Sequence, residues 1–168
     1  TAKILDPNVD LFYLDVLSSI NEIKIACEAI KNFEKPILIG VHLNNKGNLP
    51  SGETIEDLIP ISKNYNCCGI IAACVSPEIV NLAIPKLNNQ NLPFGFKVNA
   101  FKNIPENNAL ESDLFSNGYP TERYGTCADK FNPKVFKKFV ESKLKDGATL
   151  LGGCCEIKPS HIKAINEV

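Results

Sequence analysis

Residues 69–77, Gly-Ile-Ile-Ala-Ala-Cys-Val-Ser-Pro, hold the pattern that decides the fold class of this chain. The run from Gly69 to Cys74 is apolar at almost every position, which predicts a buried strand. Ser76 is a favourable helix N-cap and Pro77 suits the first helical position, so a helix should begin directly after the strand. A strand followed at once by a helix is the repeating unit of α/β proteins.

Four further units with the same alternation surround this one, and together they predict a parallel sheet. Each apolar run is short and is separated from the next by a longer amphipathic stretch rather than by a hairpin turn. Five such units indicate either a doubly wound sheet or part of an eight-stranded α/β barrel, and periodicity does not distinguish the two. The predicted strands are residues 11–14, 37–43, 69–74, 94–99 and 150–151.

The predicted helices carry start and stop signals of their own. A capping box at 19–22 opens one helix, and residues 54–65 form another that Pro60 should kink. Asn132-Pro133 opens a fourth helix, after the one at Ser76-Pro77, and Gly147 closes it; a short last helix starts near Pro159. The side chains expected to face inward are Ile20, Ile23, Cys27 and Ile30 in the first helix and Val135, Phe136, Phe139, Val140 and Leu144 in the fourth.

Residues 100–131 form the longest stretch without a regular pattern. A loop of this length inside a compact domain is usually functional or disordered. This one follows a predicted strand on the side where α/β folds build their sites. We therefore expect it to be a lid.

The composition is that of one globular domain. The chain has 168 residues, of which 44% are hydrophobic and 22% charged, enough to bury a substantial core. A net charge of -1, with basic residues dispersed among acidic ones, argues against nucleic acid or a membrane surface as a partner. No apolar run is long enough to cross a bilayer, and the first ten residues do not resemble a signal peptide, so we expect a cytoplasmic protein.

The chain begins at Thr1 and contains no Met, so we expect it to be an excerpt of a longer protein. It contains seven cysteines, an odd number. In a reducing compartment, such a chain is expected to use its thiols for metal binding or thiol chemistry rather than for a disulfide framework.

Polar and thiol side chains interrupt the apolar runs at one recurring place, the carboxyl end of each predicted strand. In parallel α/β folds this is the edge where ligands bind, so residues far apart in the sequence are expected to meet there. An ordinary helix cap is the alternative for Asp15, and a satisfied polar group is the alternative for His42 and Asn99. The residues at this edge are Asp15, His42, Cys74, Asn99, Cys154 and Cys155.

Three of these residues suit a zinc ion. A catalytic zinc site has three protein ligands and one open position, whereas a structural site is closed by four. Cys154 and Cys155 are adjacent and so lack Cys-x-x-Cys spacing, which leaves Cys74 as the natural third ligand. Gly152-Gly153 should let the backbone turn so that both thiols face one point. A pair of buried thiols without metal is the alternative, and Cys27, Cys67, Cys68 and Cys127 are expected to be structural.

The segment 146–155, Asp-Gly-Ala-Thr-Leu-Leu-Gly-Gly-Cys-Cys, followed by Pro-Ser-His-Ile-Lys-Ala-Ile at 159–165, resembles the signature that ends homocysteine S-methyltransferase domains. Cys74 matches the first zinc cysteine of that family. Residues 10–23 resemble the family's fourth strand and the helix after it, and residues 36–52 resemble its fifth unit. The resemblance covers nearly the whole chain.

The resemblance implies an (α/β)8 TIM barrel of which this chain supplies roughly strands 4 to 8. Residues 1–168 would form the homocysteine-binding domain without its N-terminal part. Zinc held by Cys74, Cys154 and Cys155 would activate the thiol of homocysteine, with no catalytic residue beyond the metal site. A methyl group would then pass from a small-molecule donor, of the onium type or derived from folate, to form methionine.

The resemblance also implies substrate contacts. Asp15 would hold the amino group of homocysteine, and Asn99 would position its carboxylate or the donor. The sequence departs from the family pattern at three places, with Ala73 where Asn is usual, Glu156 where Gly is usual, and Asp15 where Glu is common. The first and last of these bear on substrate affinity more than on metal binding.

Two other hypotheses fit the same residues. In the first, the chain is a catalytically incomplete barrel fragment that binds zinc without turnover. In the second, it is a structural zinc or redox protein whose cysteines clamp the fold. The sequence does not select the methyl donor among S-methylmethionine, S-adenosylmethionine, betaine and a methylfolate. An opened barrel would expose strand edges and apolar helix faces, which favours either a homo-oligomer or disorder.

Overall fold

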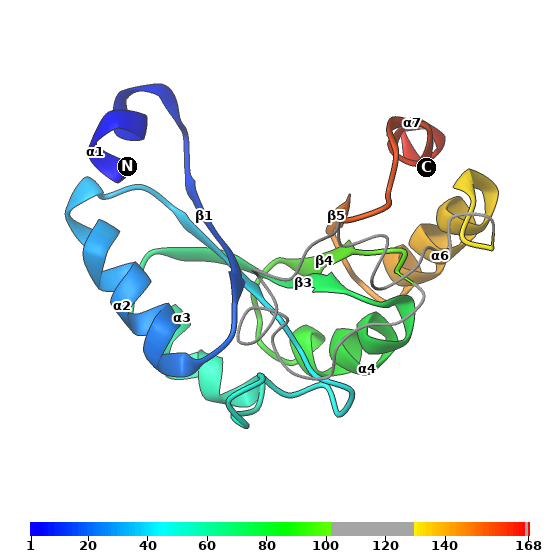
Figure 1. The fold of residues 1–168 in the computed structure, drawn as a ribbon. Coiled ribbons are helices and arrows are strands. Elements are labelled where there is room, and N and C mark those ends of the chain that lie inside the picture. The colour runs from blue at the N-terminus through cyan, green and yellow to red at the C-terminus, as the bar shows by residue number, and fades with distance from the viewer. Residues whose placement is uncertain (102–129, 167) are drawn as a thin grey trace, which may run out of the picture.

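A parallel β-sheet with helices packed along it is the framework of the protein, in a computed structural model that describes residues 1–101, 130–166 and 168 (Figure 1). Its five strands are all parallel. They are β1 (Phe12–Leu17), β2 (Ile37–Val41), β3 (Cys67–Val75), β4 (Phe94–Val98) and β5 (Leu150–Gly153). The helices are α1 (Ala2–Leu5), α2 (Ile20–Ile30), α3 (Ile59–Asn64), α4 (Pro77–Asn88), α6 (Pro133–Lys145) and α7 (Pro159–Ile165), with 3-10 turns at Asp6–Asn8, Lys31–Phe33 and Glu56–Leu58.

The strand order is β1-β2-β3-β4-β5, so each strand pairs with the next one along the chain. A doubly wound sheet reverses its order partway, and the described sheet has no such reversal. In Figure 1, α2, α3, α4 and α6 lie along the same side of the curved sheet. The fold is therefore α/β, and its sheet is compatible with part of a TIM barrel.

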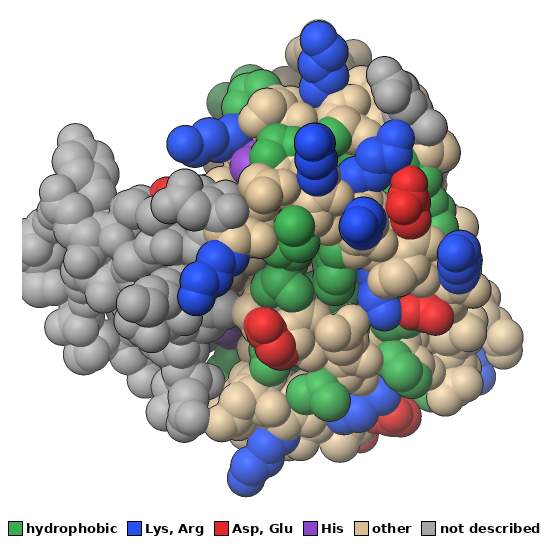
Figure 2. All heavy atoms as spheres, turned by 90° about the vertical axis from the view of Figure 1, so that its right-hand side faces the viewer, with side chains coloured by type: hydrophobic (Ala, Val, Ile, Leu, Met, Phe, Trp, Pro, Cys, Tyr) green, Lys and Arg blue, Asp and Glu red, His purple; other side chains and the backbone are tan. Residues whose placement is uncertain are grey.

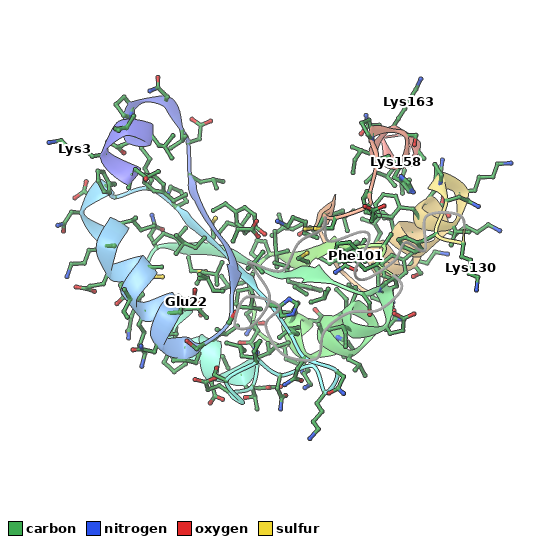
Figure 3. The ribbon with its side chains drawn as sticks, viewed as in Figure 1. Lys3, Glu22, Phe101, Lys130, Lys158 and Lys163 are labelled. Carbon is green, nitrogen blue, oxygen red and sulfur yellow. The ribbon has the colours of Figure 1, made fainter. Side chains whose placement is uncertain are left out.

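Local signals fix the start of α2 as predicted. The Ser19 hydroxyl accepts a hydrogen bond from the Glu22 amide at 3.1 Å, and the Glu22 carboxylate accepts one from the Ser18 amide at 2.7 Å. Glu22 is marked at the beginning of this helix in Figure 3. The predicted apolar face is confirmed by the burial of Ile23, Cys27 and Ile30. This face joins the core between helix and sheet.

The helix α6 begins and ends as its signals predict, but its apolar face is narrower than expected. The Asn132 side chain accepts hydrogen bonds from two backbone amides of the first turn, and Gly147 has a left-handed φ of 93° after the helix. Phe136 and Val140 are buried. Val135 and Leu144 are 40% and 36% exposed, so their predicted inward placement is wrong. They lie at the margins of the helical stripe that meets the sheet.

Three further expectations need correction. Pro60 lies in the first turn of α3, after a 3-10 turn at Glu56–Leu58, so it begins a helix rather than kinking one. The strand β5 continues through Gly153, two residues beyond its predicted end. The strand β1 continues to Leu17, so Asp15 lies inside the strand and not after it.

Charge on the surface is mixed, as the composition indicates. Figure 2 shows lysine side chains spread over the face that carries α6 and α7, with acidic and apolar side chains between them. Several of these lysines belong to the α6 sequence PKVFKKFVESKLK. None of the described helices is both long and apolar enough to cross a membrane.

Candidate metal centre

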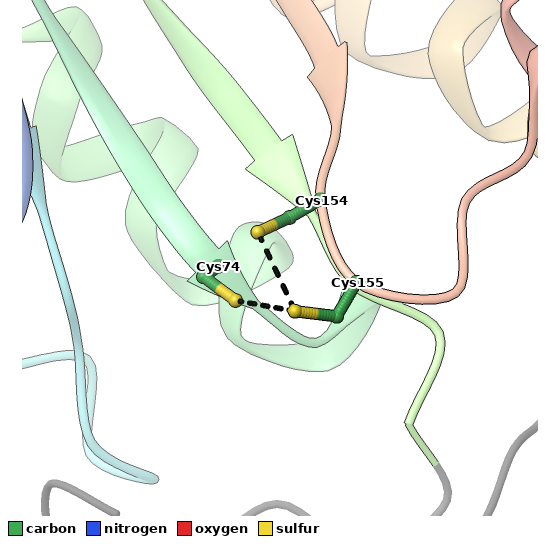
Figure 4. Close-up of side chains that lie close together, drawn as sticks. All are labelled: Cys74, Cys154 and Cys155. Atoms are coloured by element: carbon green, nitrogen blue, oxygen red, sulfur yellow. Dashed lines mark hydrogen bonds between the residues drawn. The ribbon is translucent and has the colours of Figure 1, made fainter. Parts of the chain in front are cut away.

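Three cysteine sulfurs meet at the carboxyl edge of the sheet (Figure 4). Cys74 lies near the end of β3, and Cys154 and Cys155 follow β5 directly. The Cys74 and Cys155 sulfurs are 3.8 Å apart, the Cys154 and Cys155 sulfurs are 3.9 Å apart, and all three lie within 4.8 Å of one another. Thiolates bound tetrahedrally at about 2.3 Å from a zinc ion would be about 3.8 Å apart. The donor set and its spacing therefore fit zinc.

A bulge in β3 aims the side chain of Cys74. The pairing of β3 with β4 shifts between Ala73 and Val75, and Cys74 is the extra residue with a left-handed φ of 54°. A non-glycine residue in this region is strained, and bulges commonly re-aim a side chain beside a site. In regular pairing, the side chain would follow the alternation of the strand. The bulge instead supplies the orientation seen at the cluster.

Backbone hydrogen bonds to β4 and its continuation hold the two adjacent cysteines. The Cys154 amide donates to the Val98 carbonyl at 2.7 Å, and the Ala100 amide donates to the Cys155 carbonyl at 3.0 Å. These bonds extend the ladder between β4 and β5 beyond the last residues of both strands. The thiols are thus fixed by main-chain pairing.

The two glycines before the cysteine pair, Gly152 and Gly153, do not form the backbone turn that the sequence predicted. Neither has a left-handed φ, and both lie in β5. The turn follows the pair instead, with Glu156 at φ 66° and the Ile157 amide donating to the Cys154 carbonyl at 3.1 Å. A side chain at Gly153 would lie 2.6 Å from the Ile157 Cβ, so this glycine is needed for close packing. The left-handed backbone at 156 is also a reason for glycine to be favoured there.

Asn99 supports Cys74 through a hydrogen bond to its backbone. Its side chain is buried, at 1% exposure, and its Nδ2 donates to the Cys74 carbonyl at 2.8 Å. The same Nδ2 lies 3.8 Å from the Cys74 sulfur, and Oδ1 accepts from the Phe101 amide at 3.3 Å. Asn99 therefore holds the strained residue that presents the thiol.

Replacing Asn99 with leucine should lower zinc affinity about 10- to 100-fold, because outer-shell partners of metal ligands have effects of this size. Leucine has a similar shape but offers no donor to Cys74. Zinc affinity can be measured by competition with a chromogenic chelator. The same change at Asn89, an exposed residue that caps α4, should leave zinc affinity unchanged. Equal affinity in both variants would show that Asn99 does not support the site.

The charge state of the cluster follows from its geometry. The pKa of Cys154 is lowered by hydrogen bonding from Cys155 and Cys74 and, more weakly, by the positive charge of Lys97. The pKa values of Cys74 and Cys155 are raised, in both cases first by their hydrogen bonds to Cys154. Hydrogen bonding and the nearby ammonium therefore favour the thiolate form of Cys154 over that of its two neighbours.

Asp15 forms an ion pair that the sequence did not indicate. Its carboxylate is bonded to the ammonium of Lys97, which reaches it from β4. Asp15 lies at a second bulge, where the pairing of β1 with β2 shifts between Leu14 and Leu17 and Val16 has a φ of 57°. The one signal for Lys97 in the sequence is a charged residue inside the apolar run Phe94–Val98.

The remaining candidates have structural roles in the described part of the chain. The His42 ring lies 3.4 Å from the Ala73 carbonyl, and burial lowers its pKa. His161 accepts from the Lys158 amide at 3.0 Å, so its other nitrogen donates to the Phe131 carbonyl at 2.9 Å, and the ring caps the start of α7. Cys27 is buried, whereas Cys67 and Cys68, at the start of β3, bond to the carbonyls of Gly69 and Ile37 respectively.

Cys127 and most of the predicted lid lie outside the described residues. The described chain stops at Phe101 and resumes at Lys130, both of which are marked in Figure 3.

Comparison with known proteins gives one family. The family model described as homocysteine S-methyltransferase matches residues 1–168. A relative named Homocysteine S-methyltransferase 1, from Brassica oleracea var. italica, is 23% identical over 166 residues. The match covers 97% of this chain and 47% of the relative, so the chain spans about half of that protein's length.

Proposed function

Because the chain belongs to the homocysteine S-methyltransferase family, we propose that the protein transfers a methyl group to the thiol of homocysteine and forms methionine. The donor would be a small molecule of the onium type or derived from folate. The observation that carries this proposal is the convergence of three thiols, from positions 74, 154 and 155, at the spacing expected of thiolates around a tetrahedral zinc ion.

Zinc at Cys74, Cys154 and Cys155 would lower the pKa of an incoming thiol and so supply a thiolate nucleophile at neutral pH. The chain's own residues would prepare the site for it. Cys155 is exposed, so a substrate can reach the cluster from solvent. Asn99 fixes the orientation of Cys74 and is proposed to contact the substrate as well. Asp15 is proposed to bind the amino group of homocysteine.

We also propose that β1 to β5 are strands 4 to 8 of an (α/β)8 barrel. The sequential parallel order supports this placement, and so does the position of the thiols at the carboxyl edge, where barrel enzymes carry their sites. A cytoplasmic location, which would keep the thiols reduced, is part of the same proposal.

A catalytically incomplete fragment remains the second candidate, because the chain matches only 47% of its relative's length. In that case, zinc would bind but residues 1–168 alone would not turn over. A structural zinc site is less well supported. Within the described residues, only three ligand side chains gather, and a closed site requires four.

The test is an assay of methionine formation from homocysteine with S-methylmethionine, S-adenosylmethionine, betaine and a methylfolate in turn. We expect activity with at least one donor in the full-length protein, loss of that activity on chelation, and recovery on adding zinc. Bound zinc should be close to one equivalent by elemental analysis. Activity that survives complete metal removal would contradict the proposal.

A further inference from the structure

Lys97 of β4 lies between the two strands that lead to the clustered cysteines, and no part of the proposed function involves it. It is paired with Ala73 on β3 and with Gly152 on β5. It therefore lies one residue before Cys74 and two residues before Cys154 on the neighbouring strands.

The lysine side chain lies over the sheet toward β1. Its ammonium bonds to Asp15 and lies 5.4 Å from the centre of the Tyr13 ring. Small residues beside it leave room for this course, because Ala73 and Gly152 are its partners on both neighbouring strands. Lys97 is thus fixed by a carboxylate and an aromatic ring from the same strand.

Both members of the ion pair remain open to a further partner. The Lys97 side chain is 21% exposed and that of Asp15 is 40% exposed. An ammonium has three N–H donors. In the described part of the chain, the Lys97 ammonium donates a hydrogen bond to Asp15. A carboxylate also has two oxygens, of which Lys97 contacts Oδ2.

This pairing changes what Asp15 can bind. Lys97 already neutralises the carboxylate, so a ligand that carries only an ammonium would meet a nearby positive charge as well as the negative one. A ligand with an ammonium and a carboxylate on the same carbon avoids this conflict. Its ammonium can lie at Asp15 and its carboxylate at Lys97, so that opposite charges alternate.

We infer that Asp15 and Lys97 together bind the zwitterionic end of the thiol substrate, with Lys97 as the residue that selects for a carboxylate. This inference rests on the proposed function, because it places the substrate sulfur at the cluster of Cys74, Cys154 and Cys155. It assigns to Lys97 a role in specificity. Thiols that lack either charged group are therefore poor ligands.

Three thiols with the same chain length allow the contact at Asp15 and the contact at Lys97 to be tested separately. Homocysteine has both charges, 4-mercaptobutanoate lacks the ammonium, and 3-aminopropane-1-thiol lacks the carboxylate. Binding is measured without turnover, from the change in the visible spectrum of the cobalt-substituted full-length protein as each thiol is added. Lys97→Met should lower the affinity for homocysteine and for 4-mercaptobutanoate about 10- to 100-fold, because each ligand loses a charged hydrogen bond. The amine should bind no more weakly than before.

Three further variants test the contact at Asp15, the need for a positive charge at position 97, and the specificity of the effect. Asp15→Asn should lower the affinity for homocysteine and for 3-aminopropane-1-thiol but not for 4-mercaptobutanoate. Lys97→Arg, which keeps the charge, should restore most of the homocysteine affinity. Lys63→Met, at an exposed lysine of α3, should change none of the three affinities.

Tighter homocysteine binding in Lys97→Met would overturn the inference, because Lys97 would then compete with the substrate's ammonium. Equal effects on all three thiols would also overturn it. If cobalt binds but no thiol alters the spectrum of the unmodified protein, the proposed function fails together with the inference. If the thiols bind and the variants do not discriminate among them, the inference alone fails.

Discussion

Cys74→Ala is expected to lower zinc affinity by at least about 100-fold and to abolish methyl transfer to homocysteine. The change removes one of three sulfurs that lie within 4.8 Å of one another. The zinc ion would then be bound by two thiolates and solvent instead of by three thiolates. Changes to outer-shell groups alone cost about 10- to 100-fold, so loss of a direct ligand should cost more. Zinc affinity by chelator competition and methionine formation are the two measurements.

Cys68→Ala is the matched control, because Cys68 is a half-buried thiol on the same strand that bonds to the Ile37 carbonyl, away from the cluster. It should keep full zinc binding and activity. If Cys74→Ala retains one equivalent of zinc at unchanged affinity, the metal is not held where we propose. Circular dichroism of Cys74→Ala should show that the variant is folded, so that a loss of zinc binding is not caused by unfolding.

Gly95→Ala is expected to destabilise the protein by about 3 kcal/mol or more, because the added methyl would overlap backbone rather than a movable side chain. A Cβ at Gly95 would overlap the Leu150 carbonyl group and lie 2.9 Å from the Leu150 Cα. These two residues are paired between β4 and β5. Relief would require the strands to separate, which would also displace Cys154 and Cys155. Urea unfolding and zinc affinity should both report the change.

Gly152→Ala is the control for this prediction, since Gly152 lies on β5 in the same pair of strands. A Cβ there would meet the Phe96 carbonyl oxygen at 3.9 Å and the Lys97 Cγ at 4.0 Å, both ordinary contacts. Its free energy of unfolding should change by less than about 1 kcal/mol. Similar losses in the two variants would mean that backbone crowding at Gly95 is not the cause.

The strand and helix units follow from the amino-acid sequence, because the signals for them are local. The apolar run before Ser76-Pro77 and the cap at Asn132 depend on neighbouring residues alone, and both elements form where they were predicted. The choice of Cys74, Cys154 and Cys155 also came from sequence, since parallel strands bring their carboxyl ends to one edge. The structure brings these three thiols together.

The arrangement of the site depends on contacts between strands that are far apart in the sequence. The bulge at Cys74 arises from the register between β3 and β4, and register depends on long-range pairing that no local pattern contains. The same is true of the contact between Asp15 and Lys97, which joins residues 82 positions apart across the sheet. Burial of Val135 and Leu144 was also overestimated, because helical periodicity gives the direction of a face and not how much of it the sheet covers.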